Sequence, residues 1–511
     1  MKHALFSCYF KDGIENFAKE LEENGYKIIS TGGTLKALEK AGVNVSDVSE
    51  FTGFHDMLSG RVKTLHPKIH AGILYRREKP EDVKEIKELG TQPIDIVVNN
   101  LYPFKDTYLS GASDDDIIEK IDIGGPSMIR AAAKNFKYTT IITDNADFER
   151  VIAEIKENGN TTLETRRDLA RKAFMLTAYY DAWIAKYFNE KCGVEFPDEI
   201  TLPLKKISEL RYGENPHQRG FAYTLYNGDE SGIGEAKQYQ GKELSYNNYN
   251  DASATIEMVK LFYKKPTCVA VKHTNPCGIG EADTIHEAYL KAYACDDQSI
   301  FGGIVGFNRE VDKATAEELV KIFLEVIIAP SYTKEALEVF EKKKNLRVLE
   351  VPGIGEVRKG GLDMKVLPGT VIMQDHDDKE DCKLNVVSKA HPTDEELEDL
   401  IFALKAVKFA KSNAVVLAKD GATVGIGLGN VNRFFAVQAA LKQAGDKAKG
   451  AVLASDGFFP FDDCIKLLAE NGVKAIVEPG GSIKDELSIK AADELGAVSY
   501  THLTLPTTPY V

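Results

Sequence analysis

The sequence predicts an α/β protein with more than one domain. Along residues 3–150, short apolar runs typical of strands alternate with amphipathic helical segments, which indicates a parallel sheet covered by helices. A second α/β pattern follows in two halves, roughly residues 204–360 and 385–498. The chain has 511 residues. One hydrophobic core rarely serves so many, because domains usually hold about 100–200 residues.

The first α/β segment divides into short elements. Strands are expected over residues 3–8, 26–30, 94–98 and 139–143. Helices are expected from residues 14 and 35 onward, over 126–135 and over 163–189. Pro126 suits a first helical turn, where its missing N–H costs nothing. The order of these elements predicts a parallel sheet.

The second pattern begins after residues 191–203, which have no periodicity and hold Gly193, Pro197 and Pro203, so we expect a linker there. Strands are expected over residues 268–271, 414–418, 423–426, 450–454 and 474–478. Asp-Gly at residues 420–421 lies between two of these runs and indicates a hairpin. Residues 499–511 have no period, so we expect a disordered tail, or one foreign to the domain.

Composition and charge exclude several classes of partner. The formal net charge of −14 repels nucleic acid and anionic lipid, so any phosphate must be held by a local group of cations and N–H groups. No apolar run reaches the ~18 residues of a membrane helix, and the apolar N-terminal stretch is too short for a signal peptide. Seven cysteines without a CxxC pair argue against a disulfide framework, and a cytoplasmic location fits best.

Motifs in the first segment suit a phosphorylated ligand. Residues 30–34, STGGT, follow a strand and open a helix, where N–H groups favour an anion; a plain glycine-rich turn explains them equally well. In an extended segment Arg61 and Lys63 would point to one side and need an anion or carboxylate between them, unless the strand is simply solvated. Tyr102 follows a predicted strand, at the end where ligands bind α/β sheets; packing against Pro103 is the alternative.

Arg130 and Lys134 lie four residues apart on one helical face. A buried lysine with a lowered pKa can act as a general acid or base, whereas most lysines lie on the surface.

Polar donors gather in three places of the second segment. Residues 211–218 hold Arg, Asn, His and Gln, a density that favours anion or amide recognition and that a solvated turn leaves unexplained. Lys272 beside His273 is expected to disfavour a charged imidazole and so keep it able to accept a proton; a structural histidine explains the pair as well. Asn413 and Arg433 flank the predicted hairpin and suit an oxyanion and a phosphate.

No metal site is expected. His66 and His70 are four residues apart, but Pro67 interrupts their helix and no third ligand is evident. Residues 276–280 match only half of the zinc-deaminase pattern, because Gly280 stands where the second cysteine would be.

Short motifs follow one another in a fixed order from Ala4 to about Ala497. They are STGGT, GRVKTLHP, NNLYPF, IDIGGPSMIRAAAKN, RYGENPHQ, LSYNN, VKHTNPCG, FGG, KKKNLR, SNAVVLAKDG, GIGLGN, ASDGFFPFDD and PGGSI. Together they closely resemble the bifunctional family of AICAR transformylase and IMP cyclohydrolase, where AICAR is aminoimidazole-carboxamide ribonucleotide.

The resemblance implies a methylglyoxal-synthase-like cyclohydrolase domain over residues 1–190, a linker over 191–203, and a transformylase domain over 204–498 made of two cytidine-deaminase-like lobes without zinc. It implies formyl transfer from 10-formyltetrahydrofolate to the 5-amino group of AICAR, giving FAICAR, and dehydrative closure of FAICAR to IMP. These are the last two steps of de novo purine synthesis. A homodimer with shared transformylase sites, and no metal requirement, are also implied.

The family pattern further implies roles for individual residues. Ring closure would be served by Lys63, Tyr102, Asp122 and Lys134, in a nucleotide pocket lined by Lys11, Ser30, Gly32, Gly33, Thr34, Arg61 and Thr64. Formyl transfer would be served by Lys272, His273 and Asn413, with AICAR surrounded by Arg211, Tyr212, Asn248, Gly302, Glu325 and Arg433.

The chain departs from the family pattern at Phe10, Asp297 and Asn430, and a Thr/Pro-rich end replaces the family's R-H-F-R-H. Two other functions stay open: a nucleotide-sensing protein without chemistry, and a cyclohydrolase without transformylase activity. Retention of Lys272, His273, Lys63 and Lys134 argues against the first of these.

Overall fold

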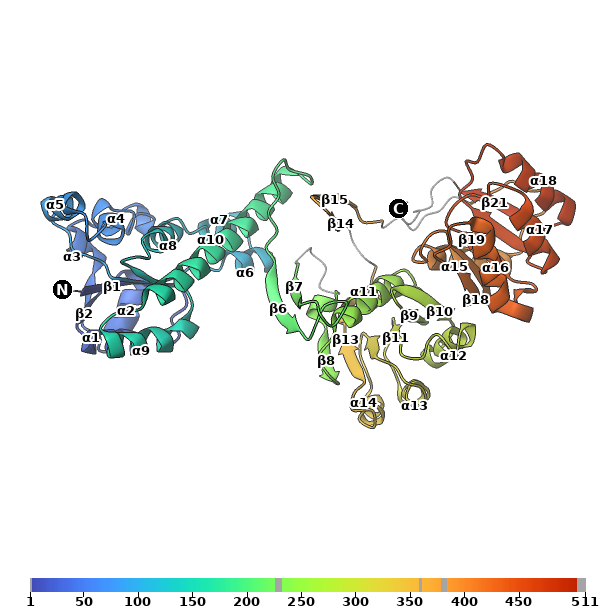
Figure 1. Cartoon of the computed structure of the whole chain (residues 1–511), viewed down its shortest axis with the longest axis horizontal. Helices are drawn as coiled ribbons and strands as arrows, with labels where there is room; N and C mark the ends of the chain where they lie inside the picture. The colour runs from blue at the N-terminus through green and yellow to red at the C-terminus, as the bar shows by residue number, and fades with distance from the viewer. Residues whose placement is uncertain (1, 226–231, 358–360, 378–383, 503–511) are drawn as a thin grey trace. The chain divides into compact units, whose positions relative to one another are not determined.

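The computed structural model describes residues 2–225, 232–357, 361–377 and 384–502. The chain divides into two compact units, Met1–Leu204 and Lys205–Val511, and Figure 1 labels many of their elements.

Within the described residues, the first unit is built on a parallel sheet of five strands in the order β3-β2-β1-β4-β5. The strands are β1 (Lys2–Cys8), β2 (Tyr26–Ser30), β3 (Val45–Asp47), β4 (Ile96–Asn100) and β5 (Thr140–Ile142). The chain builds outward from β1 on one side and then returns to its other side. Between β1 and β4 the strand order therefore reverses, which is where open α/β sheets bind ligands.

Helices cover this sheet. They are α1 (Ile14–Glu23), α2 (Gly32–Lys40), α3 (Val48–Thr52), α4 (Pro67–Leu74), α5 (Pro80–Leu89), α6 (Phe104–Leu109), α7 (Asp114–Glu119), α8 (Gly124–Lys134), α9 (Phe148–Asn158) and α10 (Leu163–Cys192), with 3₁₀ turns η1 (Leu58–Gly60) and η2 (Asn145–Asp147). The long α10 begins where Thr162 accepts a hydrogen bond from the Thr165 N–H (3.2 Å) and ends at Gly193, whose φ is 65°. The strands expected over 3–8 and 26–30 are confirmed, and the one expected over 94–98 lies two residues later.

The described part of the second unit is built on one mixed sheet of twelve strands, in the order β16-β21-β20-β19-β17-β18-β10-β9-β11-β12-β13-β8. Its first half holds β8 (Lys237–Gln240), β9 (Thr267–Lys272), β10 (Asn275–Glu281), β11 (Ile304–Phe307), β12 (Val326–Ala329) and β13 (Arg347–Glu350). Its second half holds β16 (Leu384–Val386), β17 (Val415–Lys419), β18 (Ala422–Gly427), β19 (Val452–Ser455), β20 (Ala475–Glu478) and β21 (Val498–His502). The halves join where β10 pairs antiparallel with β18, at Gly280 and Ala422.

Helices and two small hairpins complete the second unit. The helices are α11 (Tyr246–Lys260), α12 (Ile285–Cys295), α13 (Lys313–Leu319), α14 (Lys334–Phe340), α15 (Asp394–Val407), α16 (Arg433–Ala444), α17 (Asp463–Glu470) and α18 (Asp485–Leu495), with 3₁₀ turns η3 (Ile233–Glu235), η4 (Pro352–Gly355) and η5 (Gly445–Ala448). The hairpins pair β6 (Lys205–Leu210) with β7 (Gly220–Thr224), and β14 (Leu362–Leu367) with β15 (Thr370–Asp375).

Glycines let a helix approach each of the two joining strands. A Cβ added at Gly280 would lie 2.5 Å from the Ala288 carbonyl oxygen of α12, and one added at Gly427 would lie 1.9 Å from the Ala436 carbonyl oxygen of α16. Real Cβ atoms do not approach backbone so closely, so larger residues would push both helices away. The Gly-Ile-Gly run at 425–427 therefore serves helix packing.

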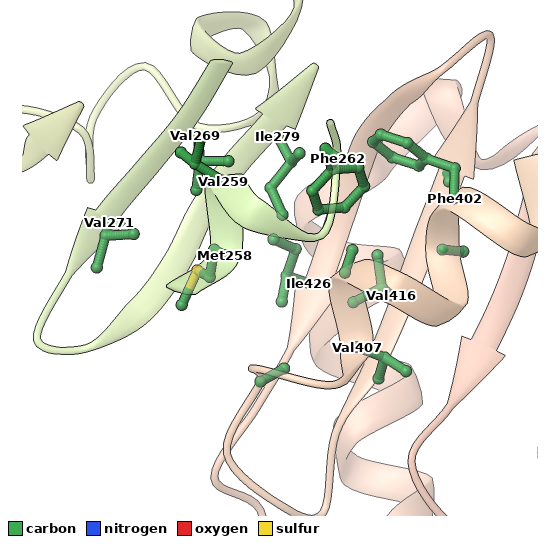
Figure 2. Close-up of a cluster of buried hydrophobic side chains, with 14 of the residues drawn as sticks. Met258, Val259, Phe262, Val269, Val271, Ile279, Phe402, Val407, Val416 and Ile426 are labelled. Atoms are coloured by element: carbon green, nitrogen blue, oxygen red, sulfur yellow. The ribbon is translucent and has the colours of Figure 1, made fainter. Parts of the chain in front are cut away.

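One hydrophobic cluster runs through both halves of the second unit. Figure 2 shows Met258, Val259 and Phe262 of the first half beside Phe402 and Val416 of the second. The rings of Phe262 and Phe402 lie 5.3 Å apart between centroids. Because these side chains are almost fully buried, the two halves share one core.

The hairpin expected around residues 420–421 is confirmed: β17 pairs antiparallel with β18, and Asp420 and Gly421 have φ values of 54° and 68°. The expectation of an irregular tail from residue 499 is wrong for its first residues. β21 continues through His502, pairing with β20 on one side and β16 on the other. Backbone hydrogen bonds to two strands hold it, which side-chain periodicity does not reveal. Residues 503–511 lie outside the described residues.

If the two halves share one core, a cavity in that core should destabilise the whole second unit. Phe262 is 1% exposed, so Phe262→Ala should lower the free energy of unfolding by about 3–5 kcal/mol in urea denaturation. Both halves should still unfold in one transition. Phe435→Ala is the control, because Phe435 is 53% exposed and its loss should cost less than about 0.5 kcal/mol. Equal effects of the two substitutions would contradict a shared core.

Candidate active sites

A cleft of about 720 Å³ lies at the carboxyl ends of β1, β2 and β4. It is lined by nine residues that the sequence singled out: Lys11, Gly32, Gly33, Thr34, Arg61, Lys63, Thr64, Tyr102 and Asp122. Ser30 is placed differently: it is fully buried and its Oγ donates to the Phe6 carbonyl oxygen at 2.9 Å. Ser30 therefore supports the strand beneath the cleft.

Two ammonium groups stand over the start of α2. A Cβ added at Gly32 would lie 3.4 Å from Lys63 Nζ, and one added at Gly33 would lie 3.8 Å from Lys11 Nζ. Because these positions lack side chains, both cations approach the backbone where α2 presents its free N–H groups. A helix start and two lysines together form a site for an anion such as phosphate.

The segment around Arg61 and Lys63 is a turn that follows η1, so these side chains do not stand side by side on a strand. Each cation faces its own carboxylate. Arg61 pairs with Glu119, and Lys63 Nζ lies 4.0 Å from the Asp56 carboxylate. The second of these contacts is long, which leaves the Lys63 ammonium available to a ligand.

A carboxyl and a phenol, Asp122 and Tyr102, also line the cleft. Asp122 accepts a hydrogen bond from the Gly125 N–H at 2.8 Å, and burial raises the pKa of its carboxyl. Burial, and then the charges of Asp122 and Glu119, raise the pKa of Tyr102. Tyr180 of α10 fixes this part of the cleft, because its hydroxyl accepts from the Asp122 N–H (3.0 Å) and donates to the Lys120 carbonyl oxygen (2.7 Å). Groups perturbed in this way suit proton transfer.

Lys134 lies outside this cleft. It is exposed in the last turn of α8 and lines a separate cleft of about 600 Å³ with Arg130, Arg167 and Phe174. Gly124 and Gly125, which line the first cleft, begin the same helix. The helix has 11 residues, so its two ends are about 15 Å apart. Within one chain, Lys134 is not brought to Lys63, Tyr102 and Asp122.

In the second unit, the candidate residues gather at one end of the large sheet. Lys272 ends β9, Gly302 precedes β11, and Glu325 precedes β12. Asn413 precedes β17 and Arg433 follows β18. The pairing registers place these strand termini along the same edge, although the residues lie far apart in the sequence.

The exposed His273 lies in the two-residue turn between β9 and β10, where His273 and Thr274 have φ values of 53° and 62°. The Asp251 carboxylate of α11 holds this turn, accepting from the His273 N–H at 3.2 Å and the Thr274 N–H at 2.8 Å. The half-buried Lys272 donates from Nζ to the Phe301 carbonyl oxygen at 2.8 Å. No local pattern in the sequence indicates this role of Asp251, which lies far from the turn along the chain.

Asn275 ties this turn to the other half of the unit. Its side chain donates to the His273 carbonyl oxygen at 2.8 Å and accepts from the Lys411 N–H at 3.2 Å. Asn413, two residues after Lys411, donates from its side-chain amide to the Asn430 carbonyl oxygen at 2.8 Å. The segment that carries Asn413 is therefore bound directly to the His273 turn.

Arg433 is 9% exposed and already has a carboxylate partner, Asp456. Its Nη1 also donates to the Ala414 carbonyl oxygen at 3.0 Å, and Asp456 accepts from the Ala414 N–H at 3.0 Å. The buried Nε of Arg433 has no hydrogen-bond partner among the described residues. Arg433 and Asn413 line a cleft of about 380 Å³, whose other wall includes Phe458 and Phe461.

The remaining candidates are held by the scaffold. Asn248 caps α11, accepting from the Ser245 N–H at 3.1 Å. Glu325 pairs with Arg347 at 2.7 Å. Arg211 and Tyr212 lie in the loop of the β6–β7 hairpin, so the large sheet does not position them.

No group of three or more His, Cys, Asp or Glu side chains is placed to hold a metal ion in the described part of the chain. Among the same residues, no helix is long and apolar enough to cross a membrane.

Two family models match the chain. One, described as the AICARFT/IMPCHase bienzyme, matches residues 132–443, and the other, the MGS-like domain, matches residues 13–127. The bifunctional purine biosynthesis protein PurH of Thermoanaerobacter sp. (strain X514) is 55% identical, over 97% of each chain. The protein of the same name from Acetivibrio thermocellus is 49% identical, also over 97% of each. A crystal structure of ForH aligns with 37% of this chain and 98% of its own, at 35% identity and a TM-score of 0.33.

Proposed function

The chain belongs to the AICARFT/IMPCHase bienzyme family, and from this premise we propose that each of its units performs one of two consecutive reactions. The protein transfers a formyl group from 10-formyltetrahydrofolate to the 5-amino group of AICAR, giving FAICAR, and closes FAICAR to IMP. It is both a formyltransferase and a cyclohydrolase of purine biosynthesis. The unit with the parallel sheet closes the ring, and the unit with the large mixed sheet transfers the formyl group.

Formyl transfer needs help because the lone pair of the 5-amino group is delocalised into the imidazole carboxamide. His273 accepts a proton from this amine as its nitrogen attacks the formyl carbon. The bond from that carbon to N10 of the folate then breaks, and Lys272 gives a proton to the departing nitrogen. Asn413 donates a hydrogen bond to the carbonyl oxygen, which becomes negative during attack.

The two hydrogen bonds of the Asn275 side chain are the observation that best supports the roles of His273 and Asn413 in formyl transfer. They hold the His273 turn against the segment that leads to Asn413, so a base and an oxyanion donor occupy one end of one sheet. Arg433 lies at the same end and lines the same cleft as Asn413, and its guanidinium is of the kind suited to the phosphate of AICAR.

The assignment predicts that His273→Ala lowers formyl transfer at least about 100-fold, the usual contribution of a general base. Closure of supplied FAICAR should be unchanged, because that reaction belongs to the other unit. Both rates are followed by absorbance with purified full-length protein. His391→Ala is the control, since His391 is exposed and outside the site. Normal transfer in His273→Ala would refute the role of this residue.

Ring closure needs mainly positioning, because the carboxamide nitrogen and the formyl carbon belong to one molecule. The phosphate of FAICAR lies at the start of α2, under Lys11 and Lys63. The carboxamide nitrogen attacks the formyl carbon, and the formyl oxygen leaves as water. Asp122 and Tyr102 move the protons, since their raised pKa values keep proton donors available in the cleft.

The position of Lys134 supports a homodimer. Lys134 lies at the far end of α8, about 15 Å from the end that lines the Lys63 cleft, which is farther than a lysine side chain extends, so it does not reach that cleft in its own chain. A second copy whose α8 end faces the cleft would supply the missing ammonium group. Such an arrangement makes the cyclohydrolase site complete only in the dimer.

A complementation experiment tests this arrangement. Lys63→Ala and Lys134→Ala should each lose ring closure when assayed alone. After subunit exchange, a mixture of the two should recover about a quarter of native activity, because half of the dimers are mixed and one of their two sites is intact. No recovery would show that both lysines act within one chain. Native activity of Lys134→Ala alone would remove this residue from the mechanism.

We place the enzyme in the cytoplasm. The cysteines of the described residues are free, and most are buried. Free thiols and the acidic charge suit a reducing compartment and small anionic ligands bound in local pockets, without a nucleic-acid or membrane partner.

A further inference from the structure

A buried carboxyl group lies behind the cleft of Asn413 and Arg433. Glu478 ends β20, next to β19 in the sheet, and is only 2% exposed. Its Oε2 accepts a hydrogen bond from the Phe459 N–H at 2.6 Å. Nothing in the family motifs or in the proposed reaction uses this residue.

The hydrogen bond fixes a loop that forms part of the cleft. Phe459 is fully buried in the core beneath α16 and α17, whereas Phe458 and Phe461 are 39% and 50% exposed and line the cleft. Anchoring Phe459 therefore sets where its two neighbours stand. The loop begins after β19 and ends at α17, so the tie from β20 holds its middle.

Glu478 also lies among charges. Burial, and then the charge of Asp485 in the first turn of α18, raise the pKa of Glu478 to about 7, while the Phe459 hydrogen bond and Arg433 oppose this rise. The pKa of the Cys464 thiol in α17 is raised mainly by burial, and the charge of Glu478 adds to this rise. Arg433 is paired with Asp456 at the end of β19. The carboxyl consequently changes its charge near neutral pH, close to the guanidinium assigned to phosphate.

We propose that Glu478 is a positioning residue for formyl transfer, which holds the Phe458–Phe461 wall of the cleft and, through its charge, modulates how Arg433 binds the phosphate of AICAR. This inference rests on the proposed function. Above neutral pH the ionised Glu478 attracts Arg433 and repels the phosphate, so KM for AICAR should rise with pH. Any pH dependence of kcat should be the same in the native protein and in Glu478→Gln. The protonated group keeps the Phe459 hydrogen bond without this competition.

The test compares Glu478→Gln and Glu478→Leu with native full-length protein between about pH 6 and pH 9. Glu478→Gln keeps an oxygen acceptor for Phe459 but cannot ionise, so its KM for AICAR should match the native value at low pH and stay flat. Glu478→Leu removes the acceptor and should raise KM about tenfold at every pH, the size expected for one lost hydrogen bond. Circular dichroism and urea denaturation of each variant report that the second unit remains folded.

Glu281→Gln is the matched control. Burial also raises the pKa of Glu281, but it lies beside the Gly421 turn, at the other end of the β17–β18 hairpin from Asn413. Its substitution should leave the pH profile unchanged. A native pH profile in Glu478→Gln, or a native KM in Glu478→Leu, would overturn the proposal. A native protein that transfers no formyl group would instead refute the proposed function.

Discussion

The pairing of β10 with β18 is the contact on which the second unit depends. Thr423 strengthens it, because its Oγ1 accepts from the Ile279 N–H at 2.9 Å and donates to the Ile279 carbonyl oxygen at 3.3 Å. This junction turns two α/β halves into one sheet and brings termini from both halves to one edge. The proposed action of His273 and Asn413 on one substrate requires this register. Glycines allow the pairing strands to be covered closely by α12 and α16.

Charge is organised locally in a chain whose net charge is −14. In the first unit, two lysines stand over glycines at the start of α2, and the half-buried carboxyl of Asp122 lines the same cleft. In the second, Arg433 is buried and held by Asp456. Buried or partly buried cations interact with a phosphate more strongly than solvated ones, because less water screens them. Each site thus attracts an anion that the whole surface repels.

Local sequence predicted most strands, including the hairpin around Asp420, because apolar runs and turn residues carry that information. It also predicted nine residues of the first cleft, through family motifs. Contacts between segments that are far apart in the sequence could not be predicted from local patterns. Asp251 holds the turn at His273 and Thr274, which lacks the Asn or Gly that is usual in two-residue hairpin turns, and Asn275 bridges the two halves of the unit. Strand β21 is held by backbone pairing, and the position of Lys134 depends on the length of α8.

The central claim is that one chain performs both reactions at two separate sheet ends. The most direct measurement mixes purified protein with AICAR and 10-formyltetrahydrofolate and follows the nucleotides by chromatography over time. FAICAR should appear first and then be converted to IMP, with one tetrahydrofolate released for each IMP formed. Consumption of neither substrate, or lasting accumulation of FAICAR without IMP, would contradict it.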